Sequence, residues 1–201
     1  MAGMRVAGIL LAAGEGTRLG RPKALVELGG LTFAERGVAL LRDGGADPVL
    51  VVTGAVPVTL SGVLTVHNRD WTTGMGSSLA TGLQALAETD VGAAIVALAD
   101  QPLVGAEAVR RLIAAYIGGA SVAVACYDGA QRNPVLIARD YWPSVLQLAI
   151  GDTGARPFLQ ANPDLITSVE CGDTGSPDDV DTDADLERVR AAATVRSEEK
   201  P

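Results

Sequence analysis

Short, almost wholly apolar segments alternate with longer segments of helical periodicity along most of this 201-residue sequence. Segments 5–12 and 93–99 are nearly continuously apolar, which is typical of parallel strands that are buried on both faces. Helix-like segments follow the strand-like ones at the spacing of crossover connections. The alternation predicts an α/β fold: a single domain of three layers, α/β/α, around a mostly parallel, Rossmann-like sheet.

The same patterns place the individual elements and the edge of the sheet where a ligand is expected. Ser77 and Ser78 are expected at the cap of their helix. The domain is expected to span residues 1–195, with 196–201 as a frayed C-terminal tail. Ligands of open parallel sheets bind at the carboxyl ends of the strands, which points to the loops after Ala12 and from Asp100. Strands are expected at 5–12, 48–52, 64–67, 93–99, 121–126, 134–137 and 166–170, and helices at 33–43, 77–88, 106–116, 141–148, 153–160 and 183–193.

Charge and cysteine content exclude several classes of function. The net charge of −8 argues against binding to a nucleic acid or to an anionic membrane surface. No apolar run approaches the ~20 residues that cross a bilayer, and the N-terminus shows no cleavage-site pattern, so we expect a cytoplasmic protein. One histidine and two scattered cysteines are too few for a zinc site. Cys126 and Cys171 are expected to be buried free thiols.

A glycine-rich loop follows the first expected strand. Segment 11–23 reads Leu-Ala-Ala-Gly-Glu-Gly-Thr-Arg-Leu-Gly-Arg-Pro-Lys. Its glycines let the backbone approach a phosphate, Arg18 can bind phosphate through two hydrogen bonds, and Lys23 adds a mobile charge. The third glycine, Gly20, comes one residue late for a dinucleotide fingerprint, and Ala24 stands where a P-loop has Ser or Thr. The alternative is a flexible strand-to-helix turn.

Two aspartates lie where a metal ion could meet this loop. Asp100 ends an apolar strand, and a carboxylate at that position beside a phosphate loop suits Mg²⁺. The alternative for Asp100 is a helix N-cap. Asp181 belongs to an acid-rich segment at the start of the last expected helix, where acidic residues are favourable without any further function.

The glycine-rich segment, followed by Leu25 and Gly29-Gly30, resembles the signature of the MobA-like nucleotidyltransferases. Within that family the sequence is most similar to the branch that transfers cytidylyl groups to the molybdenum cofactor. The resemblance extends from residue 6 to about residue 189. It implies a catalytic role for Arg18 and Lys23. It further implies a nucleoside triphosphate site formed by Leu11, Ala12, Ala13, Gly14, Gly16, Arg18, Lys23, Asn68, Ser77 and Ser78.

The resemblance also implies metal and acceptor sites. The family carries Ala-Asp-Gln-Pro at its metal-binding aspartate, which matches Asp100, and a later Asp-Thr pair matches at Asp181. Mg²⁺, or Mn²⁺, is therefore expected on these two residues. Asp183 replaces the proline that usually follows the Asp-Thr pair, and Arg-Asn-Pro replaces the usual Gly-His-Pro. The residues implied to face the acceptor are Arg132, Asn133, Asp152 and Arg156; Asp152 has the alternative of capping the helix it precedes.

The implied reaction moves a nucleoside monophosphate from its triphosphate to the phosphate of molybdopterin, with release of pyrophosphate. Ala13, where guanylyl-transferring relatives tend to carry glycine, favours CTP over GTP. A molybdoenzyme or its chaperone is the implied protein partner. Three alternatives stay open: nucleotidyl transfer to another acceptor (a sugar phosphate, a methylerythritol phosphate or a phospholactate), a dinucleotide-binding oxidoreductase, and a non-catalytic carrier of the cofactor.

Overall fold

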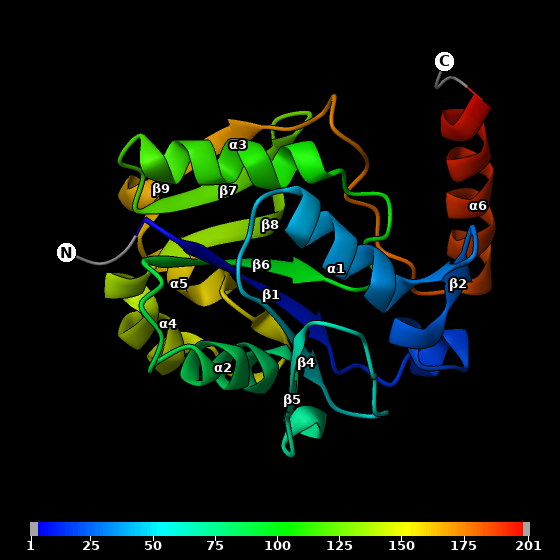
Figure 1. Ribbon diagram of the computed structural model, residues 1–201, viewed down its shortest axis with the longest axis horizontal. Helices are drawn as coiled ribbons and strands as arrows, with labels where there is room; N and C mark the ends of the chain where they lie inside the picture. The colour runs from blue at the N-terminus through cyan, green and yellow to red at the C-terminus, as the bar shows by residue number, and fades with distance from the viewer. Residues whose placement is uncertain (1–3, 199–201) are drawn as a thin grey trace.

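A seven-stranded sheet forms the centre of the protein (Figure 1). The computed structural model describes residues 4–198. The strands lie in the order β5–β4–β1–β6–β8–β7–β9; β8 is antiparallel to both neighbours and the other pairs are parallel. The expected mostly parallel α/β fold is thus confirmed. The strands are β1 (Val6–Ala12), β4 (Val49–Thr53), β5 (Leu64–His67), β6 (Ala93–Leu98), β7 (Val122–Tyr127), β8 (Ala130–Ala138) and β9 (Ile166–Glu170).

Helices cover both faces of the sheet (Figure 1). One face carries α1 (Phe33–Asp43) and α3 (Ala106–Ile117). The other carries α2 (Met75–Ala85), α4 (Trp142–Leu148) and α5 (Arg156–Ala161). Successive residues of a strand point to opposite faces, so Ile9 and Leu10 of β1 enter two separate apolar clusters, and both are fully buried. Each such side chain contributes about 1.5–3 kcal/mol by its burial, which explains the continuous apolar pattern.

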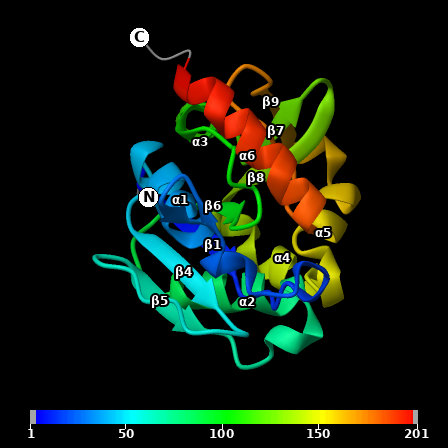
Figure 2. The same ribbon diagram turned by 90° about the vertical axis from the view of Figure 1, so that its right-hand side faces the viewer.

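The last helix, α6 (Asp183–Glu198), stands outside these three layers (Figures 1 and 2). It packs on a small hairpin of β2 (Glu27–Leu28) and β3 (Leu31–Thr32). Two-residue strands are too short to show a sequence pattern, so the hairpin was not expected. The third apolar cluster, which joins α6 to the hairpin and the glycine-rich loop, consists of Leu19, Val26, Leu28, Phe33, Leu103, Val180, Leu186 and Val189.

Several element boundaries differ from the expected ones. Helix α2 begins at Met75 with Gly74 as its N-cap, so Ser77 and Ser78 lie inside the helix and are not caps. The hydroxyl of Ser77 donates to the carbonyl oxygen of Gly74 instead. Helix α6 continues to Glu198, where a tail was expected from residue 196; residues 199–201 lie outside the described part.

Strand β8 is longer than the expected 134–137, because Gln131 and Arg132 also pair with β7, across an irregularity in the register. Cys126 and Cys171 are buried free thiols, as expected. No helix within residues 4–198 combines the length and the apolar character needed to cross a membrane.

A close backbone contact joins the loop before α3 to a later segment. A Cβ atom at Gly105 would lie 2.0 Å from the carbonyl oxygen of Thr174, whereas one at Gly118 would meet no atom nearer than 3.4 Å. We expect Gly105→Ala to lower the free energy of unfolding by about 1–3 kcal/mol, since backbone atoms cannot move aside as a side chain can. Urea unfolding measures this effect. Gly118→Ala is the control, and equal unfolding midpoints of the two variants would contradict the contact.

Candidate active site

The carboxyl ends of β1 and β6, which are neighbours in the sheet, open into a pocket of about 410 Å³. This is the edge at which open parallel sheets bind their ligands. Of the residues expected to bind the triphosphate, seven line this pocket: Leu11, Ala12, Ala13, Gly14, Gly16, Lys23 and Ser78. The rest of the lining is Glu15, Thr17, Ala24, Trp71, Thr72, Gly74, Met75, Leu98, Ala99, Asp100 and Asp152.

The glycine-rich loop folds back on itself at Gly16. This residue has φ +69°, and a Cβ atom there would lie 2.1 Å from the carbonyl oxygen of Arg21. Only glycine can adopt this backbone conformation at so close a contact. The conformation places Lys23 in the pocket. At Gly14, by contrast, a Cβ atom would meet nothing within 4 Å, so the backbone is open on that side. The loop therefore has room for a phosphate group beside its backbone N–H groups.

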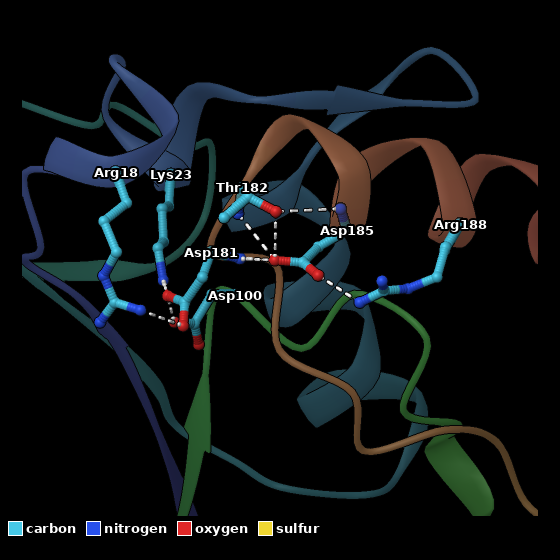
Figure 3. A network of polar contacts seen from close by, with 7 residues as sticks. All are labelled: Arg18, Lys23, Asp100, Asp181, Thr182, Asp185 and Arg188. Carbon is cyan, nitrogen blue, oxygen red and sulfur yellow. Dashed lines mark hydrogen bonds and ion pairs between the residues drawn. The ribbon is translucent and has the colours of Figure 1, made fainter.

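Lys23 lies between two carboxylates (Figure 3). Its ammonium donates to Asp100 Oδ2 at 2.8 Å and to Asp181 Oδ1 at 2.5 Å. Burial would lower the pKa of Lys23, but its attraction to Asp100 and its hydrogen bonds to both carboxylates together raise that pKa. The hydrogen bond from Lys23 lowers the pKa of Asp181. The side chains of Lys23, Asp100 and Asp181 are 17 %, 24 % and 35 % exposed.

Two arginines of the loop also reach the start of α6. Arg18 Nη1 donates to Asp181 Oδ2 at 3.1 Å, and Arg21 Nη2 donates to Asp183 Oδ1 at 2.8 Å. The Arg18 side chain is 74 % exposed, and ion pairs this exposed contribute about 0–1 kcal/mol. Its guanidinium can therefore leave Asp181 for a phosphate group at little energetic cost.

Asp100 is not a helix N-cap, and the start of α6 is closed without the side chain of Asp181. The N-cap of α3 is Gly105, so Asp100 does not begin that helix. The start of α6 is closed by Thr182 and Asp185: Thr182 Oγ1 accepts from the backbone N of Asp185 at 3.2 Å, and Asp185 Oδ2 accepts from the backbone N of Thr182 at 2.8 Å. This reciprocal pair satisfies the helix start without the side chain of Asp181, which faces Lys23 instead (Figure 3). Asp185 is held in turn by Arg188.

Asn68 holds the start of α2 beside the pocket. Its Nδ2 donates to Ser77 Oγ at 2.8 Å and to Ser78 Oγ at 3.0 Å. Asn68 and Ser78 are both buried, and Ser78 alone of the three lines the pocket. The structure brings these three residues into contact, but Asn68 and Ser77 do not line the pocket. Trp71 both lines the pocket and packs against Gly54, where a Cβ atom would lie 2.5 Å from Trp71 Cβ.

The residues expected to face the acceptor are only partly assembled. Asp152 lines the pocket, and its Oδ1 accepts from the backbone N of Met75 at 3.3 Å. It therefore serves the start of α2 and does not cap α5, whose N-cap is Ala155. Strand pairing carries Arg132 and Asn133 towards the sheet edge where Asp100 follows β6, but neither these two nor Arg156 lines the pocket.

Two residues beside the carboxylate pair, Gln101 and Asp179, were not expected to belong to the site. Gln101 is 5 % exposed, and its Nε2 donates to Asp179 Oδ1 at 2.9 Å and to the carbonyl oxygen of Pro177 at 3.0 Å. Burial and the nearby charge of Asp100 raise the pKa of Asp179. The sequence offers one indication of their role: each residue adjoins a segment that already contains a candidate metal ligand. Nothing in either segment indicates that Gln101 and Asp179 contact each other.

The donor set fits a divalent cation that binds together with a phosphate ligand. Within residues 4–198, no three or more His, Cys, Asp or Glu side chains form a group that could hold a metal ion. Asp100 and Asp181, however, both contact the same ammonium, so one small cation could be reached by both. Mg²⁺ is commonly held by one or two carboxylates, with water and substrate phosphate oxygens completing its shell.

The sheet order, the glycine-rich loop after β1, and the pair formed by Asp100 after β6 and Asp181 before α6 define an α/β protein of the nucleotidyltransferase class. The chain belongs to the MobA-like NTP transferase family, since the profile of the MobA-like NTP transferase domain matches residues 8–166. The matched span contains the loop and Asp100. Asp181 and α6 lie beyond it.

Individual relatives carry different names. The nicotine blue oxidoreductase of Paenarthrobacter nicotinovorans is 37 % identical over 190 residues, which cover 88 % of this chain and 92 % of that protein. The molybdenum cofactor guanylyltransferase of Rhodobacter capsulatus is 33 % identical over 115 residues, 56 % of this chain and 60 % of that protein. The crystal structure of the Rv0371c homologue from Mycobacterium sp. strain JC1 is 31 % identical, with a TM-score of 0.84, covering 95 % of this chain and 98 % of that chain.

Proposed function

We propose that this protein is a metal-dependent nucleotidyltransferase that transfers CMP from CTP to the phosphate of molybdopterin and releases pyrophosphate. The observation that carries the proposal is the position of Lys23 between Asp100 and Asp181, at the end of the glycine-rich loop. Lys23 and Asp100 line the pocket, and Asp181, which contacts both Lys23 and Arg18, adds a second carboxylate beside it. A molybdoenzyme or its chaperone is the partner that would receive such a product.

In this reaction an oxygen of the acceptor phosphate attacks the α-phosphorus, and the bond to the β-phosphate oxygen breaks as pyrophosphate departs with the electron pair. Both reactants are anions, so catalysis consists mainly of alignment and neutralisation of charge. Lys23 and Arg18 bind the triphosphate oxygens and stabilise the departing pyrophosphate. Mg²⁺ or Mn²⁺, held by Asp100 and Asp181, would neutralise phosphate charge. The attacking phosphate is already ionised and needs no general base.

The preference for CTP rests on Ala13. Ala13 lines the pocket, and its methyl group lies close to Gly54, where a Cβ atom would be 2.8 Å from Ala13 Cβ. A methyl group there narrows the pocket against a purine, although one methyl contributes only about 1–3 kcal/mol of discrimination. The relative named molybdenum cofactor guanylyltransferase makes GTP the competing substrate.

Pyrophosphate release with each of the four nucleoside triphosphates, Mg²⁺ and molybdopterin tests this proposal. We expect release with CTP alone and only when the acceptor is present. Ala13→Gly is expected to raise the ratio of GTP to CTP turnover about tenfold, because it removes the methyl group. If the parent protein prefers GTP, the proposed transfer chemistry stands and the proposed role of Ala13 is wrong. A sugar phosphate, methylerythritol phosphate and phospholactate in the same screen test the other acceptors.

A second candidate function is an oxidoreductase, which the relative named nicotine blue oxidoreductase favours, at 37 % identity over 88 % of this chain. The open backbone at Gly14 would suit the pyrophosphate of a dinucleotide as well as a triphosphate. The two functions differ in their need for Asp100. Reduction of nicotine blue by NADH or NADPH that survives in Asp100→Asn, without triphosphate turnover in the parent, would establish the second candidate. Silence in both assays would favour a non-catalytic carrier.

A further inference from the structure

Segment 177–181 lies against the end of β6 and carries one of the two proposed metal ligands. The backbone N of Val180 donates to the carbonyl oxygen of Asp100 at 2.9 Å, and the Val180 side chain is fully buried. Asp181 follows directly. The position of its carboxylate beside Lys23 therefore depends on the contacts that hold this segment against the end of β6.

The side chain of Gln101 makes two hydrogen bonds that hold the segment in this position. It is 5 % exposed and uses its amide group to bind two points of the segment, Asp179 Oδ1 at 2.9 Å and the Pro177 carbonyl oxygen at 3.0 Å. A buried amide is costly to leave without partners, so these bonds favour one position of the segment over others.

Asp179 would be a third acidic candidate for the metal site if only the sequence were considered. In the structure Gln101 binds one of its carboxylate oxygens, whereas Lys23 contacts Asp100 and Asp181. The absence of any group of three potential ligands among residues 4–198 agrees with this division of roles.

We propose that Gln101 is a positioning residue: by binding the Asp179 carboxylate and the Pro177 carbonyl, it places Asp181 opposite Asp100, and Asp179 is an anchor and not a metal ligand. The inference rests on the proposed function, since it takes Asp100 and Asp181 as the metal-binding pair. It also accounts for how a segment beyond the family match at residues 8–166 becomes part of the site.

Three substitutions test the two halves of the proposal. Gln101→Leu and Asp179→Leu each remove one side of the contact, whereas Asp179→Asn removes the charge but keeps an oxygen that Gln101 can bind. The measurement is the dissociation constant of Mn²⁺ in the presence of CTP and without acceptor, by electron paramagnetic resonance. We expect the two Leu variants to bind Mn²⁺ about tenfold more weakly and Asp179→Asn to stay within about threefold of the parent. CTP binding without metal should not change.

Gln131→Leu is the matched control, because it also removes an Nε2 hydrogen bond between two segments, to Ser168 Oγ at 3.0 Å. If Gln101→Leu binds Mn²⁺ as tightly as this control, the positioning role is wrong. If Asp179→Asn loses as much Mn²⁺ affinity as Asp181→Asn, then Asp179 is a ligand and its role as an anchor is wrong.

A measurement without metal or nucleotide separates this inference from the proposed function. Hydrogen exchange of the Val180 amide should become at least about tenfold faster in Gln101→Leu and in Asp179→Leu but not in Asp179→Asn, because that amide is protected by the fastened segment. Unchanged exchange in both Leu variants would overturn the positioning role. Faster exchange in a protein whose parent form binds no Mn²⁺ would contradict only the proposed function.

Discussion

Asp100→Asn is expected to lower metal-dependent pyrophosphate release by about 10³-fold, because it removes one of two carboxylates available to the cation that neutralises the reacting phosphates. Asparagine has nearly the same shape, and Lys23 keeps its hydrogen bond to Asp181, so the fold should persist. The assay is pyrophosphate release with CTP and acceptor across a range of Mg²⁺ concentrations. Circular dichroism confirms that the variant is folded.

Asp173→Asn is a suitable control for this change. Asp173 is an exposed aspartate that pairs with Arg111 and does not line the pocket, so its substitution should leave turnover within about twofold. If Asp100→Asn kept activity within a factor of a few, the proposed metal-binding role of Asp100 would be wrong.

Lys23→Met should have a similarly large effect on turnover, about 10³-fold, because it removes the cation that is proposed to stabilise the departing pyrophosphate. It should also lower stability, since Asp100 and Asp181 are then left close together without a counter-charge. We expect a loss of about 1–3 kcal/mol in the free energy of unfolding. That is less than for a fully buried pair, because the Asp181 side chain is 35 % exposed. Urea unfolding without metal measures it.

The same variant tests whether Lys23 and a metal ion bind the same carboxylates. With the ammonium gone, Mg²⁺ should bind the pair more readily and stabilise Lys23→Met in proportion to its occupancy, whereas the parent should respond less. Thermal unfolding over a series of Mg²⁺ concentrations gives the comparison. Adding Asp100→Asn should abolish the extra response, and an equal Mg²⁺ response of Lys23→Met and the parent would contradict the shared site.

The sequence predicted the layered fold well because the sheet is buried on both faces. Strands β1 and β6 are therefore apolar along their whole length, and β1 has no exposed residue. Elements whose form depends on tertiary contacts were harder to predict. The β2–β3 hairpin packs on α6. Helix α2 begins at Met75, after Gly74, which lies so close to Gly151 that a Cβ atom at Gly74 would be 2.4 Å from the carbonyl carbon of Gly151.

The separate segments of the candidate site could be identified from the sequence, but the contacts between them could not. The glycine-rich loop and Asp100 each follow a recognisable apolar strand, so each was found. Lys23 and Asp181 are 158 positions apart, and no local pattern shows that their side chains meet. The proposed acceptor roles of Arg132, Asn133 and Arg156 stay predictions, because all three lie outside the pocket lining.

The long separation between Lys23 and Asp181 has a consequence for synthesis on the ribosome. An emerging chain contains the glycine-rich loop early, but the carboxylate pair is incomplete until residue 181 has left the exit tunnel. A nascent or cleaved chain that stops before this point keeps the loop that is proposed to bind the triphosphate and lacks Asp181. Because Asp181 is one of the two proposed metal ligands, partial translation products that end before it are expected not to release pyrophosphate.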